Sequence, residues 1–366
     1  MRLEGIDILR GFAVTVVVLH HFFEILGLHE YTFYPYASTL GQLGVPLFFV
    51  ISGYLIYQSI DYSISTKGTK GGLKHYTLHR LFRILPAYYF NFFIIFILAL
   101  YFLNTMDTWS DKFIGKQIFS HLTFTSYFIY KISGLGINGA YWTLSIEMLW
   151  YIMAPLLFIF IKKDRYLILL FCMSLLYLVS LDLSLLDPLL QLNHSASNYI
   201  NLLFYWSFQL PGQLIYFLAG IFIYKYSKKN ISLSRFVQYS VVPLSIYLFI
   251  YLSSQKYFLE SLTFRNLITL LIVTLLFMVL YRYKRTELHL LAWIGKISYS
   301  LYLWHMPLLF IFKRYITLSD ISLWSVASIY LVLLFTISAL SYYLIEEGGF
   351  YLRKRLEQKI AKISVP

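Results

Sequence analysis

Cysteine and acidic residues are scarce in this chain. Its 366 residues include one cysteine, Cys172, and 17 acidic residues against 30 basic ones. A single cysteine excludes an intramolecular disulfide, and its apolar surroundings disfavour the thiolate that a nucleophile needs. Charged residues make up only 13% of the chain, whereas a soluble domain has about 25%. These shortages exclude an ordinary soluble domain and argue against cysteine chemistry.

Long apolar runs take the place of the missing charge. Hydrophobic residues make up 59% of the chain, in runs too long and too frequent for a soluble core. A helix satisfies its own backbone hydrogen bonds in lipid, so we expect an all-α, polytopic transmembrane bundle. No internal repeat is apparent, and a short aromatic patch at 118–130 is expected to be interfacial or re-entrant. We predict about ten spans, at 7–27, 40–60, 84–103, 139–160, 165–182, 208–226, 236–253, 264–281, 292–312 and 322–344.

Basic residues orient these spans. Lys and Arg are absent from 28–39 and 183–207 but cluster in 61–83 and in the alternate segments that follow. By the positive-inside rule, both termini are cytoplasmic. We expect one membrane domain over 1–347 and a basic tail over 348–366, with a first helix too long for a cleavable signal peptide. Because the net charge of +13 follows the topology, it does not indicate a nucleic-acid partner.

The first apolar helix carries ionisable side chains. In IDILRGFAVTVVVLHHFFEIL, residues 6–26, the directions of Arg10 and His21 around the helix axis differ by only about 20°. They therefore share one stripe, about 16 Å apart along the axis. Such residues usually face a protein interior or a cavity, because burial in lipid is costly. The alternatives are that Arg10 snorkels to the headgroups and that His21 is a packed histidine bonded to a hydroxyl, which we expect of His20.

Two more ionisable residues are expected at the depth of His21. The predicted orientation places Glu147 about two turns below the outer face, and His305 in the outer half of a late span. Three ionisable residues at one depth favour a shared site. Alternatively, Glu147 braces helices through Ser or Tyr partners, and His305, near a helix end, caps or packs. Trp142 either stacks on a sugar ring or belongs to the interfacial aromatic belt.

A basic pair lies at the cytoplasmic side. HRLFRILPAYY places Arg80 and Arg83 at i and i+3 on one helix face. One interpretation is that this pair binds phosphates, for which the planar guanidinium groups of arginine are suited, together with Arg10 and with Arg282, Lys284 or Arg285. The other is that these charges only set the membrane topology. The stretch STKGTKGG, residues 65–72, is predicted to be a flexible loop and lacks the spacing of a P-loop.

Two other patterns are weaker indications of a functional site. His75 and His79 have the i, i+4 spacing of a metal pair, but no third ligand is evident, so we expect no metal. The run GVPLFFVISGYLI, residues 44–56, threads Pro46, Ser52 and Gly53 through the second span. Small residues permit close helix contact and proline bends helices, so packing alone explains this run.

Five of these motifs, in order, resemble the membrane-bound acyltransferase-3 family, whose members include O-antigen and exopolysaccharide O-acetyltransferases. They are IDILRGFAVTVVVLHHF, GVPLFFVISGYLI, RLFRILPAYY, WTLSIEMLWY and ISYSLYLWHMP, and they cover residue 3 to about 347. The resemblance implies transfer of an acyl group, usually acetyl from acetyl-CoA, to a carbohydrate or other acceptor outside the cytoplasm. A surface polysaccharide or lipopolysaccharide O-antigen is the implied acceptor, and the bacterial inner membrane is the implied location.

The resemblance also implies the site residues. The family's essential residues fall on Arg10, His21, Glu147, Arg80 and Arg83. Tyr302, His305 and Trp142 are candidates for contact with the acceptor. Pro46 stands where the family commonly has Asp, and Glu346-Glu347-Gly348 replaces the usual Glu-Arg-Pro, which leaves the role of Glu346 open. The hydrolase-like domain of some members is not expected here.

The implied mechanism follows from these assignments. Donor phosphates bind Arg10, Arg80 and Arg83, and the thioester arm reaches His21, the general base on an acceptor hydroxyl. Glu147 orients His21 or binds the sugar, and an acyl-His21 relay is an open alternative. The rival is a proton-coupled transporter or flippase of glycans or lipid-linked sugars, which also holds charged residues in the membrane. The lack of visible repeats or paired broken helices argues against that rival.

Overall fold

The computed structural model describes residues 4–101, 111–129, 137–193, 198–226, 235–281, 288–315 and 322–363. These residues are almost all helical, and the described ranges contain no strand. The expected all-α fold is confirmed. The chain divides into two compact units. Unit 1 comprises Met1–Phe23, His29–Ser59 and Ile146–Lys296, and unit 2 comprises Glu24–Leu28, Ile60–Ser145 and Ile297–Pro366.

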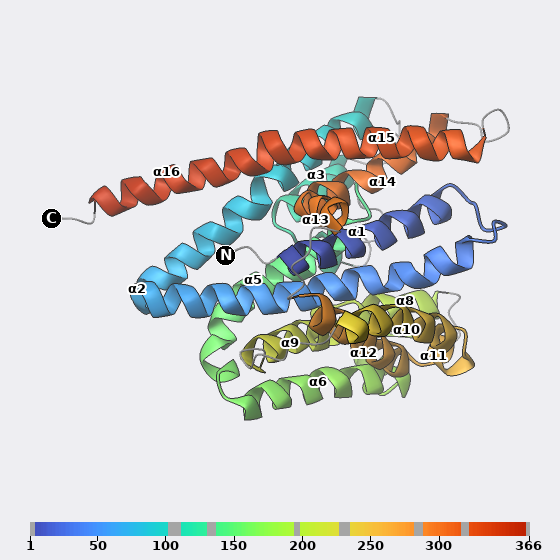
Figure 1. The fold of residues 1–366 in the computed structure, drawn as a ribbon, viewed down its shortest axis with the longest axis horizontal. Coiled ribbons are helices and arrows are strands. Elements are labelled where there is room, and N and C mark those ends of the chain that lie inside the picture. Colours follow the sequence, from blue (N-terminus) through green and yellow to red (C-terminus); the bar gives the residue numbers. More distant parts are fainter. Residues whose placement is uncertain are drawn as a thin grey trace. The chain divides into compact units, whose positions relative to one another are not determined.

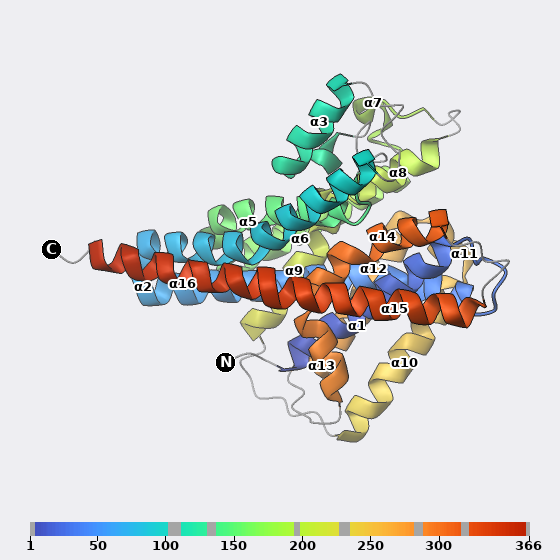
Figure 2. The ribbon, with the colours of Figure 1, turned by 90° about the horizontal axis from the view of Figure 1, so that it is seen from above.

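Unit 1 contains α1, the first part of α2, most of α5, and the helices from α6 to α13 (Figures 1 and 2). In it, α6 packs against α9, and α10 packs against α12. The bounds are α1 (Glu4–Ile25), α2 (Tyr34–Tyr101), α5 (Tyr141–Ile161), α6 (Asp164–Asp182), α7 (Asp187–Leu190), α8 (Tyr199–Ser207), α9 (Leu210–Tyr226), α10 (Arg235–Ser253), α11 (Lys256–Glu260), α12 (Leu262–Leu280) and α13 (His289–Lys296).

The N-terminus of α12 shows how these helices are held together. The Asp182 carboxylate, at the end of α6, accepts hydrogen bonds from the backbone N–H groups of Leu262 and Thr263 at 2.7 and 2.8 Å. The Ser261 side chain caps the next N–H, that of Phe264. A carboxylate at a helix N-terminus satisfies orphan donors and complements the helix dipole. One acidic residue thereby joins two apolar helices.

Unit 2 contains the rest of α2, the beginning of α5 and the C-terminal helices. Figure 1 shows α15 and α16 in red, following each other as one long helical rod, with the short π-helical segment η3 between them. Tyr330 on α15 donates a hydrogen bond to the carbonyl oxygen of His305 on α14. The bounds are α3 (Asp111–Leu122), η1 (Ser126–Phe128), α14 (Ser298–Tyr315), α15 (Leu323–Ser341), η3 (Tyr342–Glu346) and α16 (Glu347–Ile363).

Seven helices in the described part of the chain are long and apolar enough to cross a membrane. Six of them each overlap one predicted span, and they begin with α1 and end with the rod that contains α15. The seventh is α2, which is far longer than one span and contains the two predicted spans 40–60 and 84–103. The membrane-spanning bundle is therefore confirmed, while the count of ten spans stays a prediction.

One predicted span is interrupted within the described residues. The predicted span 292–312 divides at Ile297 between α13 and α14. Pro307 lies inside α14, which continues to Tyr315, so placing His305 near a helix end was wrong. The predicted span at 236–253 coincides with α10. Hydropathy sums the apolar content of a segment and does not register a break in its backbone.

The basic segment 61–83 is helical on both sides of Gly68, so the loop predicted at 65–72 reduces to a tight turn within it. Only Gly68 leaves the helical region, with φ 68° and ψ 175°. A left-handed φ is accessible to glycine at little cost, so the chain reverses there. The two arms touch immediately beyond the turn: a Cβ on Gly72 would lie 2.6 Å from the carbonyl oxygen of Ser63. The tip of α2 is therefore a helical hairpin that carries the basic cluster.

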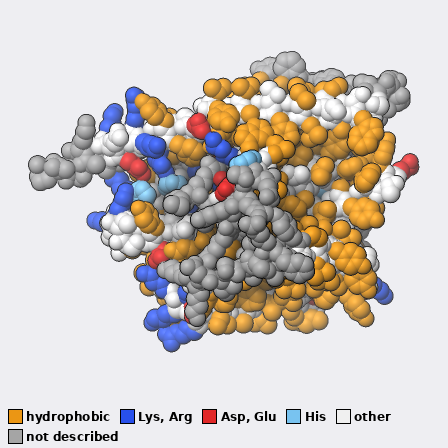
Figure 3. Space-filling view, viewed as in Figure 1, with side chains coloured by type: hydrophobic (Ala, Val, Ile, Leu, Met, Phe, Trp, Pro, Cys, Tyr) orange, Lys and Arg blue, Asp and Glu red, His pale blue; other side chains and the backbone are white. Residues whose placement is uncertain are grey.

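The outer surface of the spans is apolar. On α5, Leu156 and Ile159 are each 70% exposed, and hydrophobic side chains cover much of the face shown in Figure 3. Exposed apolar surface of this extent is unfavourable in water and marks a surface made for another apolar phase. Helices with such faces are lipid-exposed, in agreement with the membrane bundle.

The membrane orientation is a testable prediction. Cys172 is exposed on α6, so labelling needs a Cys172→Ser background. In that background, Phe33→Cys, in a predicted outer loop, is expected to react with an impermeant thiol reagent in intact cells. Lys354→Cys, in the predicted cytoplasmic tail, is expected to react only after permeabilisation, because positively charged segments stay inside. The reverse labelling pattern would overturn the orientation and the cytoplasmic side of the donor.

Candidate functional site

Arg10 is held inside unit 1 by an acidic neighbour. A guanidinium nitrogen of Arg10 lies 3.7 Å from a carboxylate oxygen of Asp7, one helical turn earlier on α1, and the two side chains are 14% and 11% exposed. A largely buried charge is tolerated when it is paired. Arg10 thus faces protein rather than lipid, which does not favour the snorkelling alternative. Asp7 is a partner that the sequence analysis did not include.

The turn of α1 that carries Arg10 is in close contact with α13. A side chain on Gly295 would collide with the carbonyl oxygen of Asp7, and one on Gly11 would collide with the carbonyl oxygen of Leu291. Only glycine lets two helix backbones approach this closely. The backbone beneath Arg10 is therefore fixed by packing.

His20 and His21 differ in their surroundings. Their ring centroids are 4.9 Å apart and both side chains are half-buried. A Cβ on Gly41 of α2 would collide with the Cβ and ring of His20, so α2 packs directly on that residue. This is the packing position expected of His20. His21, one position on, points about 100° away around the helix.

Glu147 on α5 is bound by two hydroxyl groups. Ser52 of α2 donates a hydrogen bond to its Oε1, and the Tyr151 hydroxyl donates a second at 2.7 Å. Hydroxyl donors stabilise a carboxylate and fix its orientation. These are the Ser and Tyr partners of the helix-bracing alternative. The same bonds also position an acid within the unit that contains His21.

The small residue next to Ser52 has a packing role. A side chain on Gly53 would collide with the carbonyl oxygen of Phe217 on α9. Close backbone contact of this kind requires glycine on one helix. The second-span motif therefore joins α2 to α9 through Gly53 and to α5 through Ser52.

Arg80 and Arg83 lie in unit 2, on the second arm of the α2 hairpin. Arg80 is buried, with its guanidinium carbon 5.8 Å from the centroid of the Tyr76 ring, and Arg83 is half-buried. Both charges act on the imidazole of His79. The other basic residues predicted for this cluster lie outside the described residues, namely Arg282, Lys284 and Arg285.

The His75–His79 pair does not extend to a metal cluster. Their ring centroids are 6.2 Å apart, and His75 Nε2 lies 3.7 Å from Glu357 Oε1. Among the described residues, no group of three or more His, Cys, Asp or Glu side chains is arranged to hold a metal ion. His75 here faces the carboxylate of Glu357.

The candidate acceptor residues are also in unit 2. His305 is fully buried, with Nδ1 2.7 Å from the carbonyl oxygen of Tyr302, and Tyr302 accepts a hydrogen bond from Thr143 at 2.9 Å. Trp142 is half-buried, and its ring centroid lies 5.3 Å from that of Tyr127. Trp142 is less buried than Tyr302 and His305, so stacking on a sugar stays a prediction for its ring, and His305 has the surroundings of a packed residue.

A buried polar network in unit 2 escaped the sequence analysis. Asn91, which is 0% exposed, accepts hydrogen bonds from the Tyr141 hydroxyl at 2.5 Å and from Asn138 at 3.4 Å. Asn138 also donates to the carbonyl oxygen of Leu303 at 2.9 Å. An asparagine inside an apolar span is the signal that predicts such a network, because a polar group in lipid needs partners.

His121 belongs to the same region of unit 2. It lies on α3, outside the seven candidate spans, and its ring stacks on Phe92 with centroids 5.6 Å apart. Burial lowers the pKa of His121, and its Nδ1 lies 2.8 Å from the carbonyl oxygen of Gln117. The imidazole is therefore neutral at physiological pH and has a structural position.

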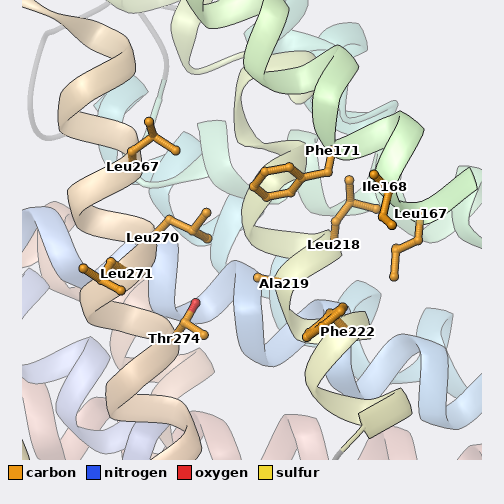
Figure 4. A pocket seen from close by; sticks show the side chains of 10 residues that line it. All are labelled: Leu167, Ile168, Phe171, Leu218, Ala219, Phe222, Leu267, Leu270, Leu271 and Thr274. Atoms are coloured by element: carbon orange, nitrogen blue, oxygen red, sulfur yellow. The ribbon is translucent and has the colours of Figure 1, made fainter. Parts of the chain in front are cut away.

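An apolar pocket of about 430 Å³ lies in unit 1 among α6, α9 and α12 (Figure 4). Its walls include Phe171 on α6, Leu218 and Phe222 on α9, and Leu271 and Thr274 on α12. None of its ten lining residues is ionisable. It offers no acid, base or phosphate ligand, so it is not the place where acyl chemistry is carried out.

Comparisons with known proteins bear on the reaction class. A family model described as "Acyltransferase domain", of the acyltransferase-3 type, matches residues 3–345. A protein of Acidianus two-tailed virus named "Putative acetyltransferase ORF330" is 26% identical over 299 residues, which cover 81% of each chain. No solved structure matches this chain. The matched segment contains every candidate site residue and ends just before α16.

Proposed function

We propose that this chain, which belongs to the acyltransferase-3 family and is a membrane acyltransferase, moves an acetyl group from cytoplasmic acetyl-CoA to a carbohydrate hydroxyl outside the cytoplasm. The name of the viral relative supports an acetyl group. The resemblance of the five motifs supports a surface polysaccharide or lipopolysaccharide O-antigen as the acceptor. It also supports placement in a bacterial inner membrane.

The observation that carries this proposal is the pair of ionisable residues on α1. Arg10 and His21 share one stripe of a helix that is apolar and long enough to span the membrane. Ionisable groups in such helices are costly, and they are retained chiefly where they serve function. Arg10 is largely buried beside Asp7, as expected of a group that faces the interior of the protein.

In the proposed reaction, His21 acts as the general base. Its imidazole takes the proton from an acceptor hydroxyl, and the hydroxyl oxygen attacks the thioester carbonyl carbon. The resulting oxyanion collapses, the C–S bond breaks, and the leaving thiolate takes the proton back from the imidazolium. The products are an acetyl ester and free CoA thiol. In the alternative, an imidazole nitrogen of His21 attacks the thioester and the thiolate leaves. The acceptor hydroxyl then attacks the acyl-His21, the N–C bond breaks, and the hydroxyl proton passes to the thiolate.

The other candidate residues bind and orient. Arg80 and Arg83 are proposed ligands of the donor phosphates, for which their planar forks are suited, and Arg10 is proposed as a third. Glu147, oriented by Ser52 and Tyr151, either orients His21 or accepts a hydrogen bond from the sugar. Its two hydroxyl partners support a carboxyl group that is fixed in orientation.

The proposal is tested by thiol release. Purified full-length chain in lipid nanodiscs, given acetyl-CoA and a glycan extract from the host surface, is expected to release free thiol and form acetyl esters. A transporter or flippase would consume no acetyl-CoA. Mass spectrometry of host glycans with and without the gene is expected to show loss of an acetyl ester. Absence of both thiol release and ester loss would exclude the proposed reaction.

A further inference from the structure

Helix α16 lies beyond the segment that matches the family, yet it packs along the second arm of the α2 hairpin within unit 2. A Cβ on Gly349 would lie 2.9 Å from both the carbonyl oxygen of Phe82 and the Cγ of Pro86. Further along α16, Glu357 lies 3.7 Å from His75. The contact that lies further along α16 involves a residue that lies earlier in α2, so α16 is antiparallel to this arm. The segment is a packed helix rather than a loose basic tail.

Arg353 lies between these two contacts. Its Nε and Nη1 atoms are buried and have no hydrogen-bond partner among the described residues. Its charge acts on the imidazoles of both His75 and His79 on α2. Arg353 therefore faces α2 with donor atoms that are shielded from solvent and unused.

Arg353 meets Arg80 and Arg83 around one imidazole. All three positive charges act on His79, and Arg80 is itself buried. Figure 3 shows Lys, Arg and His side chains gathered over the hairpin of α2 and the C-terminal part of α16. Glu357 of α16 also acts on His75, with its Oε1 3.7 Å from His75 Nε2.

Such a cluster is suited to bind an anion. Like charges that converge repel one another, and buried donors without acceptors are unfavourable. A phosphate group relieves both the charge repulsion and the lack of acceptors, since its negatively charged oxygens accept several hydrogen bonds from guanidinium groups.

We propose that α16 supplies Arg353 to a phosphate-binding site that it forms with Arg80 and Arg83, and that this site holds a phosphate of the nucleotide end of the acyl donor. The inference rests on the proposed function for the nucleotide donor. It adds a residue from outside the family-matched segment. The phosphate of an anionic lipid headgroup has the same chemistry, so the experiment separates the two sources.

The test measures binding of adenosine 3′,5′-bisphosphate, which carries nucleotide phosphates and no thioester. Full-length chain is titrated in phosphatidylcholine nanodiscs, which contain no anionic lipid. Arg353→Gln is expected to weaken binding about ten- to a hundredfold, the size of a lost charge-assisted contact. Arg353→Lys, which keeps the charge and loses the fork, is expected to fall in between. Arg355→Gln is the matched control, because Arg355 is exposed with its guanidinium over Tyr351. The affinity of this variant for the bisphosphate is expected to stay within about twofold of the wild-type affinity.

A second pair of variants tests the packing of α16 rather than the charge of Arg353. Gly349→Leu keeps Arg353 but forces α16 away from Phe82 and Pro86, so it is expected to weaken nucleotide binding. Gly348→Leu is its control, since nothing lies within 4 Å of a Cβ there. Thermal unfolding of each variant is measured alongside. Weaker binding in Gly349→Leu with a normal unfolding temperature supports the proposal even where Arg353→Gln folds poorly.

The outcomes separate this inference from the proposed function. Wild-type affinity in both Arg353→Gln and Gly349→Leu overturns the role of α16 while leaving the acyltransferase proposal intact. Loss of binding to phosphatidylglycerol vesicles alone, with nucleotide affinity unchanged, assigns the phosphate to lipid and also overturns it. If the wild type binds neither acetyl-CoA nor the bisphosphate, the proposed donor fails and this inference fails with it.

Discussion

His21→Gln is expected to fold and bind acetyl-CoA but to lose turnover by about two to four orders of magnitude, the usual contribution of general base catalysis. Glutamine keeps the polarity and approximate size of the side chain but cannot accept the hydroxyl proton. The measurement is thiol release together with acetyl-ester formation. Donor affinity and unfolding temperature are recorded for the same preparations, so that chemistry is separated from folding.

His20→Gln is the matched control for this prediction. His20 packs against Gly41 of α2, so its replacement is expected to change stability more than turnover. Near-normal turnover in His21→Gln would remove His21 from the mechanism. Equal losses in the two variants, accompanied by a falling unfolding temperature, would mean that both histidines are packing residues.

The helices were largely predictable because each span is a local property of the chain. An apolar run must form its hydrogen bonds internally in lipid, so its length and composition determine that it is a helix. The predicted spans at 7–27 and 165–182 differ by a few residues at most from α1 and α6. Breaks were not predictable in this way. Gly68 and Gly72 look alike in sequence, but Gly68 forms the turn while Gly72 lies in a helix and packs against Ser63.

The types of residue that form the site were predictable from the sequence, but the hydrogen-bond and ion-pair partners of these residues were less so. Asp7 is one turn from Arg10, so its ion pair was visible in the sequence as an i, i+3 spacing. The hydrogen bond from Ser52 to Glu147 joins residues 95 positions apart, which periodicity cannot reveal. Arg353 was predicted only as part of the basic tail over 348–366, because its position relative to Arg80 depends on how α16 packs. Long-range packing decides which polar residues meet, and a single sequence carries little of that information.

Arg10→Ala and Arg83→Ala are each expected to weaken acetyl-CoA binding about ten- to a hundredfold. A charge-assisted contact to phosphate contributes about 1.5–3 kcal/mol. The acceptor has no phosphate contact in this scheme, so its apparent affinity is expected to change little. The measurement is donor binding by titration calorimetry, paired with the acceptor concentration dependence of turnover.

The Asp7 ion pair makes the Arg10 prediction sharper. If Arg10 binds donor phosphate, Asp7 competes with that phosphate for the guanidinium, and Asp7→Asn is expected to leave donor affinity unchanged or raise it. If Arg10 serves only to hold α1 in place, Asp7→Asn and Arg10→Ala break the same ion pair, and both are expected to lower the unfolding temperature together. Opposite effects of the two variants on donor affinity therefore assign Arg10 to the phosphate. Unchanged donor affinity in both Arg10→Ala and Arg83→Ala would reduce these arginines to a signal of membrane orientation.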